Sequence, residues 1–238
     1  MTETIKIGGL SIVVTKKDIK NVHLSVHPPD GRVTLAAPRA TRLDVARAYA
    51  IAKLGWIREQ QKKLENQARE SPRQCIERES HYLWDRRHLM SVVHCDTKPF
   101  VSLDHKRITL TVRRGSSAMK RAEVIHEWHK SLLHEVVPPL ITKWERKLKA
   151  RVAGYFLQRM KTKWGSCNHR AGHIRLNTEL VKKPKDLLEY VIVHEMAHLL
   201  ERTHSDRYIA ILDEHYPSWR EARAELNELP LTAVVWKS

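Results

Sequence analysis

Residues 184–204, which read PKDLLEYVIVHEMAHLLERTH, decide the fold of this chain. Proline is favoured at the start of a helix, and apolar residues fill most positions between Pro184 and Leu200. This pattern predicts a helix of about 17 residues that is buried over most of its surface. Polar side chains inside such a helix need a partner that compensates for the loss of water.

The predicted helix carries His194, Glu195 and His198. Residues four apart lie on one face of an α-helix, so both imidazoles can bind one zinc ion at about 2.0–2.1 Å. Glu195 is rotated by about 100° from His194, which places its carboxylate beside a bound metal. From there it can accept a proton from zinc-activated water and pass it to a leaving group. The pattern predicts a zinc-dependent hydrolase with Glu195 as general base.

A third metal ligand is expected, because a catalytic zinc site has three protein ligands and one open position. His204 can reach the metal only if the helix ends at or just after Leu200 and the chain turns. The hydroxyls of Thr203 and Ser205 favour such an end, since they can cap a following helix. We therefore predict that His204 completes the site.

The alternative third ligand is a carboxylate on the following helix, Asp213 or Glu214. The interval from His198 to His204 has the metzincin spacing, but Glu201 stands where metzincins have a turn-making glycine. The motif therefore does not identify a metzincin.

The rest of the chain predicts an α+β fold with a strand-rich N-terminal region. Strands are expected at 5–38 in short runs, near 81–84, 89–95, 99–103 and 107–113, and at 155–162 and 173–177. Other helices are expected from Thr41 for about 25 residues, from Ser116-Ser117 to about Lys149, and over 205–213 or longer. The predicted domains are 1–115, with one long helix among strands, and 116–238, the helical core.

Turn and breaker residues separate these elements. Asp30-Gly31 predicts a hairpin turn, and Ser71-Pro72 ends the first long helix. Pro138-Pro139 is expected to break or kink the second.

The formal net charge of +16 is unevenly spread. Residues 151–183 hold eight basic and one acidic side chain, whereas residues 184–238 hold six basic and ten acidic ones. A field of this size attracts polyanions, so a nucleic acid or nucleotide is a candidate partner.

Cysteine content and hydropathy point to the cytoplasm. Cys75, Cys95 and Cys167 are widely spaced and odd in number, which fits a reducing compartment rather than a disulfide framework. We expect no secretory signal and no membrane span, because no apolar run approaches about 18 residues.

Residues 159–219 resemble the YgjP-like metallopeptidase family, a relative of the SprT-like and WLM zinc peptidases. The matching pieces are 163–167 (KWGSC), 174–177 (IRLN), Pro184, 194–198 (HEMAH) and 204–205 (HS). A looser match follows the N-terminal strands that end in Pro38, at 53–57 (KLGWI). The resemblance implies a zincin-like metallopeptidase core, with His194, His198 and His204 as zinc ligands and Glu195 as base.

The segment before the helix suggests where substrate binds. Trp164-Gly165-Ser166 is interpreted as a turn, and the following strand, 174–177, as a neighbour of the metal helix. If this strand is an edge, an extended peptide can pair with it; otherwise it is internal. The candidate substrate-binding residues are Trp164, Arg175, Asn177 and Tyr208. Tyr208 or His215 is the candidate oxyanion donor.

Three functions remain open. The first is a cytoplasmic zinc metallopeptidase that acts on a protein or peptide substrate. The second is a metal-dependent nucleoside triphosphate phosphohydrolase, in which the basic residues of 151–183 would hold the nucleotide. The third is a DNA-associated protein whose protease activity is recruited to nucleic acid.

Overall fold

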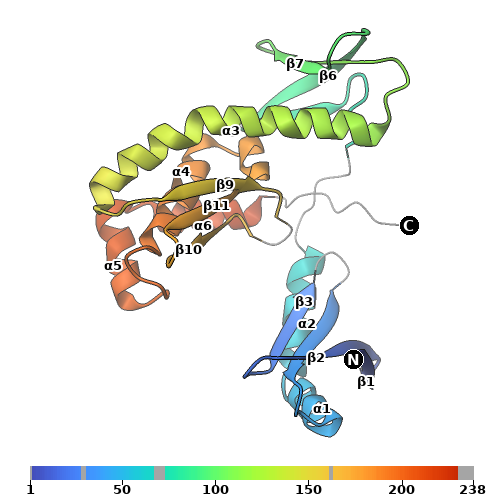
Figure 1. The fold of residues 1–238 in the computed structure, drawn as a ribbon, viewed down its shortest axis with the longest axis vertical. Coiled ribbons are helices and arrows are strands. Elements are labelled where there is room, and N and C mark those ends of the chain that lie inside the picture. The colour runs from blue at the N-terminus through green and yellow to red at the C-terminus, as the bar shows by residue number, and fades with distance from the viewer. Residues whose placement is uncertain (1, 28–30, 67–72, 161–162, 230–238) are drawn as a thin grey trace. The chain divides into compact units, whose positions relative to one another are not determined.

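The computed structural model describes residues 2–27, 31–66, 73–160 and 163–229, and it divides the chain into two compact units, Met1–Arg69 and Glu70–Ser238 (Figure 1). Both contain helices and sheets, so the predicted α+β class is confirmed. The predicted boundary between residues 115 and 116 lies inside the second unit, because strands of 80–112 pack on the long helix that follows them. In the described residues, no helix is long and apolar enough to cross a membrane.

The first unit is a four-stranded sheet covered by helices, in the order β1-β2-β4-β3. Strands β2 and β4 are parallel, and the other two pairings are antiparallel. Ile12, Val33 and Leu35 from the sheet pack against Ala50 and Ile57 from the helices. The elements are β1 (Thr2–Ile7), β2 (Leu10–Lys17), β3 (His23–His27), β4 (Arg32–Pro38), α1 (Leu43–Ala52) and α2 (Leu54–Asn66).

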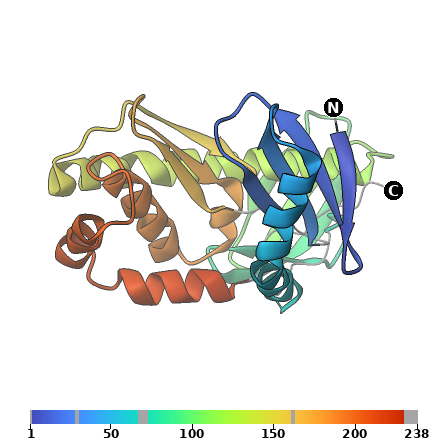
Figure 2. The ribbon, with the colours of Figure 1, turned by 90° about the horizontal axis from the view of Figure 1, so that it is seen from below.

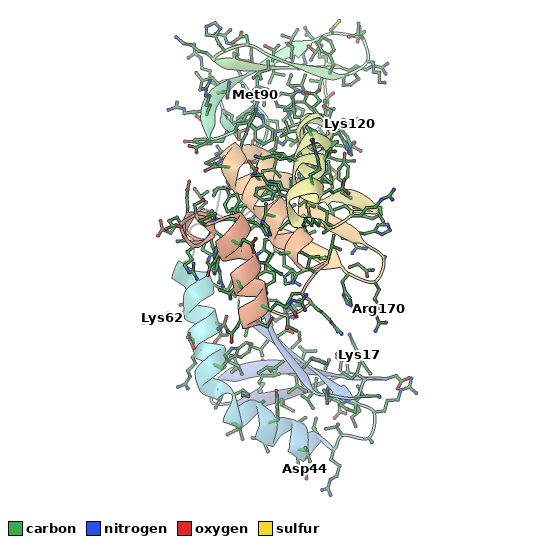
Figure 3. All side chains as sticks on the ribbon, turned by 90° about the vertical axis from the view of Figure 1, so that its left-hand side faces the viewer. Lys17, Asp44, Lys62, Met90, Lys120 and Arg170 are labelled. Carbon is green, nitrogen blue, oxygen red and sulfur yellow. The ribbon has the colours of Figure 1, made fainter. Side chains whose placement is uncertain are left out.

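The helix expected from Thr41 is two helices that meet at Lys53. The amide of Lys53 donates to the carbonyls of both Tyr49 and Ala50, which tightens the last turn of α1. Figure 3 shows the bend between α1, which carries Asp44, and α2, which carries Lys62. Of the predicted turns, Asp30 and Ser71-Pro72 lie outside the described residues, while Gly31 has the left-handed φ of +67° that such a turn requires.

The second unit begins with a sheet in the order β5-β6-β8-β7, close to the strands expected there. Met90, Ile108 and Leu110 of this sheet pack against Ile125 of α3 (Ala118–Leu148). Ser117 caps α3 as predicted, with its hydroxyl accepting a hydrogen bond from the Lys120 amide at 3.2 Å. The strands are β5 (Ser80–Leu83), β6 (Arg86–His94), β7 (Phe100–Leu103) and β8 (Arg107–Val112).

Helix α3 continues through Pro138 and Pro139, so the predicted break is wrong. Both prolines are exposed, whereas Leu133, Val137 and Ile141 bury the other side of the helix in the core. The two positions that lack an amide donor therefore lie on the exposed side of the helix. Packing of the opposite side in the core holds the helix together.

A second sheet and the helices α4 to α6 complete this unit (Figures 1 and 2). The sheet order is β10-β11-β9, with β11 antiparallel to β10 and parallel to β9. Helix α4 contacts α3, α5, α6, β10 and β11, which explains its nearly continuous apolar sequence. The elements are β9 (Gly154–Gln158), β10 (Gly165–Asn168), β11 (His173–Asn177), the 3-10 helix η1 (Thr178–Lys182), α4 (Lys185–Ala197), α5 (Asp206–His215) and α6 (Trp219–Glu228).

Candidate metal centre and cleft

Helix α4 begins after Pro184, as predicted, but ends at Ala197 rather than near Leu200. The amides of Leu199 and Leu200 donate to the carbonyls of Met196 and Ala197, three residues back. The chain therefore tightens at His198 and leaves the helix axis one turn early. This early end directs residues 201–204 back toward the face that carries His194.

The structure brings His204 to His194 and His198. The three histidines offer ring nitrogens that all lie within 4.8 Å of one another. The Nε2 atoms of His194 and His204 are 3.5 Å apart. Two nitrogens on one tetrahedral zinc ion, each at about 2.0–2.1 Å, would be separated by about 3.3 Å. The donor set and its spacing thus fit a zinc ion.

The outer nitrogens of two of these rings are already engaged. Nδ1 of His194 lies 2.8 Å from the Tyr208 hydroxyl, which also donates to the His194 carbonyl at 3.2 Å. Nδ1 of His198 lies 3.2 Å from the carbonyl of Glu201. A hydrogen on each Nδ1 satisfies these contacts and leaves each Nε2 lone pair free for a metal. Burial, with the charges of His198 and His204, lowers the pKa of His194 to about 3, so this ring is neutral at physiological pH.

The carboxylates considered as third ligands lie elsewhere. Asp213 accepts hydrogen bonds from the indole of Trp219, at 2.7 Å, and from Arg220. Glu214 is exposed, and His215 is 3.8 Å from it. Neither carboxylate belongs to the histidine cluster.

Glu195 is only 5% exposed, and it lies against strand β10. A Cβ added to Gly165 would come within 2.5 Å of Oε1 and 2.7 Å of Cγ of Glu195. Only glycine lets the strand approach this carboxylate so closely. Burial raises the pKa of Glu195 to about 8, and the charge of Lys163 partly opposes that rise. The site thus holds a buried carboxylate of raised basicity next to the histidines.

These groups open into a cleft of about 760 Å³. One wall is the segment 163–169, and the others come from α4, the turn after it, and α6. Cys167 and His169 lie on the first wall, whereas the ring of His173 packs against Phe156. The cleft is the natural place for a substrate, because the histidines and Glu195 line it.

Of the four candidate substrate-binding residues, only Trp164 lines the cleft. Arg175 lies over the ring of Phe156, 5.7 Å from its centroid. Asn177 is 1% exposed, and its amide donates to the carbonyls of Met160 and Lys163, so it holds the loop before β10. Periodicity gave no sign of this inward role.

Neither candidate oxyanion donor reaches the cleft. Tyr208 is 1% exposed, and its hydroxyl is engaged by His194, so it orients that ring instead. His215 does not line the cleft either.

The strand at the cleft is β10, not the segment 174–177. Strand β11 pairs on both sides and is internal, whereas β10 pairs only with β11 among the described residues. Gly165 and Ser166, interpreted as part of a turn, are the first two residues of this edge strand. The structure thus has the internal alternative for 174–177, and only the interpretation of Gly165-Ser166 as a turn is wrong, because strand pairing is a non-local property.

Sequence reasoning also missed several residues. Tyr190, Arg202 and Arg223 line the cleft, and Arg223 comes from α6, whose packing on α4 could not be foreseen. A second group of possible metal ligands, Cys75, Glu79 and His81, lies outside the cleft.

Known proteins resemble this chain to different degrees. No curated protein matches the chain. Two solved structures show a partial likeness. The metallopeptidase zymogen abylysin of Pyrococcus abyssi has 19% sequence identity and a TM-score of 0.36, over 38% of this chain and 90% of that one. The metallopeptidase zymogen jannalysin of Methanocaldococcus jannaschii has 20% identity and a TM-score of 0.33, over 37% of this chain and 90% of that one. The YgjP-like metallopeptidase domain matches residues 20–229, which is most of the chain, and this protein therefore belongs to the YgjP-like family of metal-dependent peptidases.

Proposed function

We propose that this metallopeptidase is a zinc enzyme that hydrolyses peptide bonds in a protein or peptide substrate. His194, His198 and His204 hold the zinc, and Glu195 is the general base. The observation that carries this proposal is the convergence of three ring nitrogens within 4.8 Å beside a buried carboxylate.

Three neutral imidazoles suit zinc and leave its full formal charge in place. When bound, the ion would lower the pKa of water and polarise the scissile carbonyl. The protein's own contribution begins with Tyr208 and the Glu201 carbonyl, which fix the orientation of the first two rings.

Glu195 supplies the proton transfer. Its burial favours proton uptake, so the carboxylate can accept a proton from water and then deliver it to the amine that leaves. The contact with Gly165 holds the carboxylate against the cleft wall.

Strand β10 is the proposed docking site for the substrate main chain. The edge that no strand of the described residues occupies can pair with an extended peptide, which would hold the scissile bond across the cleft. We further propose a cytoplasmic location, supported by the free state of Cys75, Cys95 and Cys167.

The phosphohydrolase alternative gains less support from the cleft. Within the described part of 151–183, Lys163 is the one basic side chain that lines it. DNA association through the basic surface stays a prediction, and salt-dependent binding to duplex DNA tests it.

The function is tested by turnover of casein and of nucleoside triphosphates with wild type and Glu195→Gln. We expect about one zinc per chain in both proteins, casein cleavage by wild type, and a 10²- to 10⁴-fold loss in the variant. Equal rates in the two proteins, or triphosphate hydrolysis without proteolysis, would contradict the proposal.

A further inference from the structure

The charges around the cleft are one-sided. Lys163, Arg202 and Arg223 line it, and Glu195 is its one carboxylate among the described residues. All three cationic residues are exposed, and none has a carboxylate within 4.0 Å in the described part of the chain. Their charges are therefore available to a ligand.

This distribution does not follow from the composition of the region. Residues 184–238 contain ten acidic and six basic residues, so a random sampling would make this side of the cleft acidic. Instead Arg202 and Arg223 line it together with the single carboxylate of Glu195, whereas Asp206, Asp213 and Glu214 do not. The fold separates the two signs of charge and places positive charge at the site.

The cations flank the reacting groups from different elements. Lys163 lines the cleft two residues before the start of β10. Arg223 lines the cleft from α6, which packs on α4. Arg202 lies in the turn between α4 and α5. A segment bound across the cleft would meet positive charge on several sides.

We propose that the cleft selects extended peptide segments rich in aspartate and glutamate around the scissile bond. Guanidinium groups bind carboxylates through paired hydrogen bonds, and the free edge of β10 supplies main-chain pairing. Trp164 and Val191 add apolar surface to the cleft, against which the methylene groups of the peptide's side chains can pack. This selectivity rests on the proposed peptidase function.

Binding is measured without turnover in the zinc-loaded Glu195→Gln protein. Fluorescence anisotropy compares three labelled peptides of equal length that differ only in having glutamate, glutamine or lysine at the flanking positions. We expect the glutamate peptide to bind about fivefold more tightly than the glutamine peptide for each ion pair formed, with an advantage that shrinks in salt. Equal or weaker binding of the glutamate peptide overturns the proposal.

Charge reversal locates the effect. Arg223→Glu is expected to abolish or invert the preference for the glutamate peptide, whereas Arg207→Glu on the exposed side of α5 keeps it. An equal loss in both variants would assign the preference to net charge and overturn the proposal. A second result would also overturn the proposal: tighter binding of a duplex oligonucleotide than of the glutamate peptide, with the affinity for the duplex lowered by Arg223→Glu but not by Arg207→Glu.

The same peptides separate this proposal from the function itself. If wild type cleaves the glutamine peptide as fast as the glutamate peptide, peptidase activity stands and the selectivity fails. If no peptide is cleaved although the glutamate peptide binds most tightly, the charge preference of the cleft stands and the proposed peptide hydrolysis fails.

Discussion

Two clusters of potential metal ligands in the second unit differ in what their donor atoms already do. In the cluster of His194, His198 and His204, the first two rings use Nδ1 for contacts outside the cluster, and Nε2 of His194 faces Nε2 of His204. In the cluster of Cys75, Glu79 and His81, the Glu79 carboxylate is already hydrogen-bonded within the cluster, to the Cys75 amide and the His81 ring. Proximity of ligand-type residues is the same in both, so it cannot decide which cluster binds metal.

The second cluster is a hydrogen-bonded support for a strained loop. Oε2 of Glu79 accepts from the Cys75 amide at 2.7 Å and lies 2.9 Å from Nε2 of His81, while Oε1 accepts from the Gln74 amide at 2.9 Å. Cys75 has a left-handed φ of 54°. Burial, followed by the charge of Glu79, raises the pKa of the Cys75 thiol to about 11, so it keeps its proton. A metal there would have to displace these bonds.

Zinc content gives the largest expected contrast between the clusters. We expect one zinc per chain, with His204→Ala lowering zinc affinity by orders of magnitude and Cys75→Ser leaving it unchanged. Glu214→Ala, which removes the alternative ligand, serves as the matched control on α5. Elemental analysis and competition with a chelator measure both quantities. Two zinc ions per chain, or zinc loss in Cys75→Ser, would contradict the prediction that only the histidine cluster binds zinc.

A smaller but still large effect is expected from Gly165→Ala. The added methyl group would overlap Oε1 of Glu195, which must shift because β10 is held by β11. A displacement of about 1 Å at a catalytic group can cost about 10²-fold in rate, so kcat should fall while zinc stays bound. Gly55→Ala in α2 is the matched control, because an added Cβ would meet no atom within 4 Å beyond its own chain neighbours and the adjacent helix backbone. Unchanged turnover in Gly165→Ala would mean that the close approach of β10 does not position the proposed general base Glu195.

The histidine cluster could be predicted from sequence because its information is local. The apolar run predicts α4, and the spacing of four places two candidate ligands on one face of it. Ser205 caps the next helix by accepting from the Tyr208 amide. Tyr208 lies in the first turn of α5 after that cap. Its hydrogen bond with the His194 ring became visible only in the structure.

What sequence could not supply is non-local. The edge position of β10 depends on the parallel pairing of β11 with β9, which no local pattern encodes. The Glu79 cluster is also close in sequence, yet its residues give no periodic signal, since the segment before β5 is irregular. Arg223 reaches the cleft only through the packing of α6 on α4.

The support role of the second cluster predicts a loss of stability without a loss of zinc. Glu79→Ala removes the acceptor for the amides of Gln74 and Cys75 and for the ring of His81. We expect the free energy of unfolding to fall by about 2 kcal/mol, because the donors of the buried residues Cys75 and His81 lose their partner. Denaturant titration measures the change, and elemental analysis should show zinc as in wild type. Loss of zinc in Glu79→Ala would contradict this prediction, because it would show that the second cluster contributes to zinc binding.

The smallest expected effect is a pH dependence from buried imidazoles near the second cluster. His129 lies close enough to feel the charges of Lys182 and His81, and burial lowers its pKa well below the usual value. Its Nε2 has no hydrogen-bond partner among the described residues.

In the unfolded chain His129 would take up a proton near pH 6.5, whereas the folded chain resists it, so the unfolded state binds more protons below that pH. Acidification from pH 6.5 to 5.5 should therefore lower the free energy of unfolding by about 1 kcal/mol through this group. Urea titrations of wild type and His129→Leu, both freed of metal with a chelator, isolate the contribution, since the variant lacks the ring and should show a shallower slope. Parallel slopes would mean that the ring is protonated equally in both states, and the imidazole of His129 would then have an acceptor or water contact in solution.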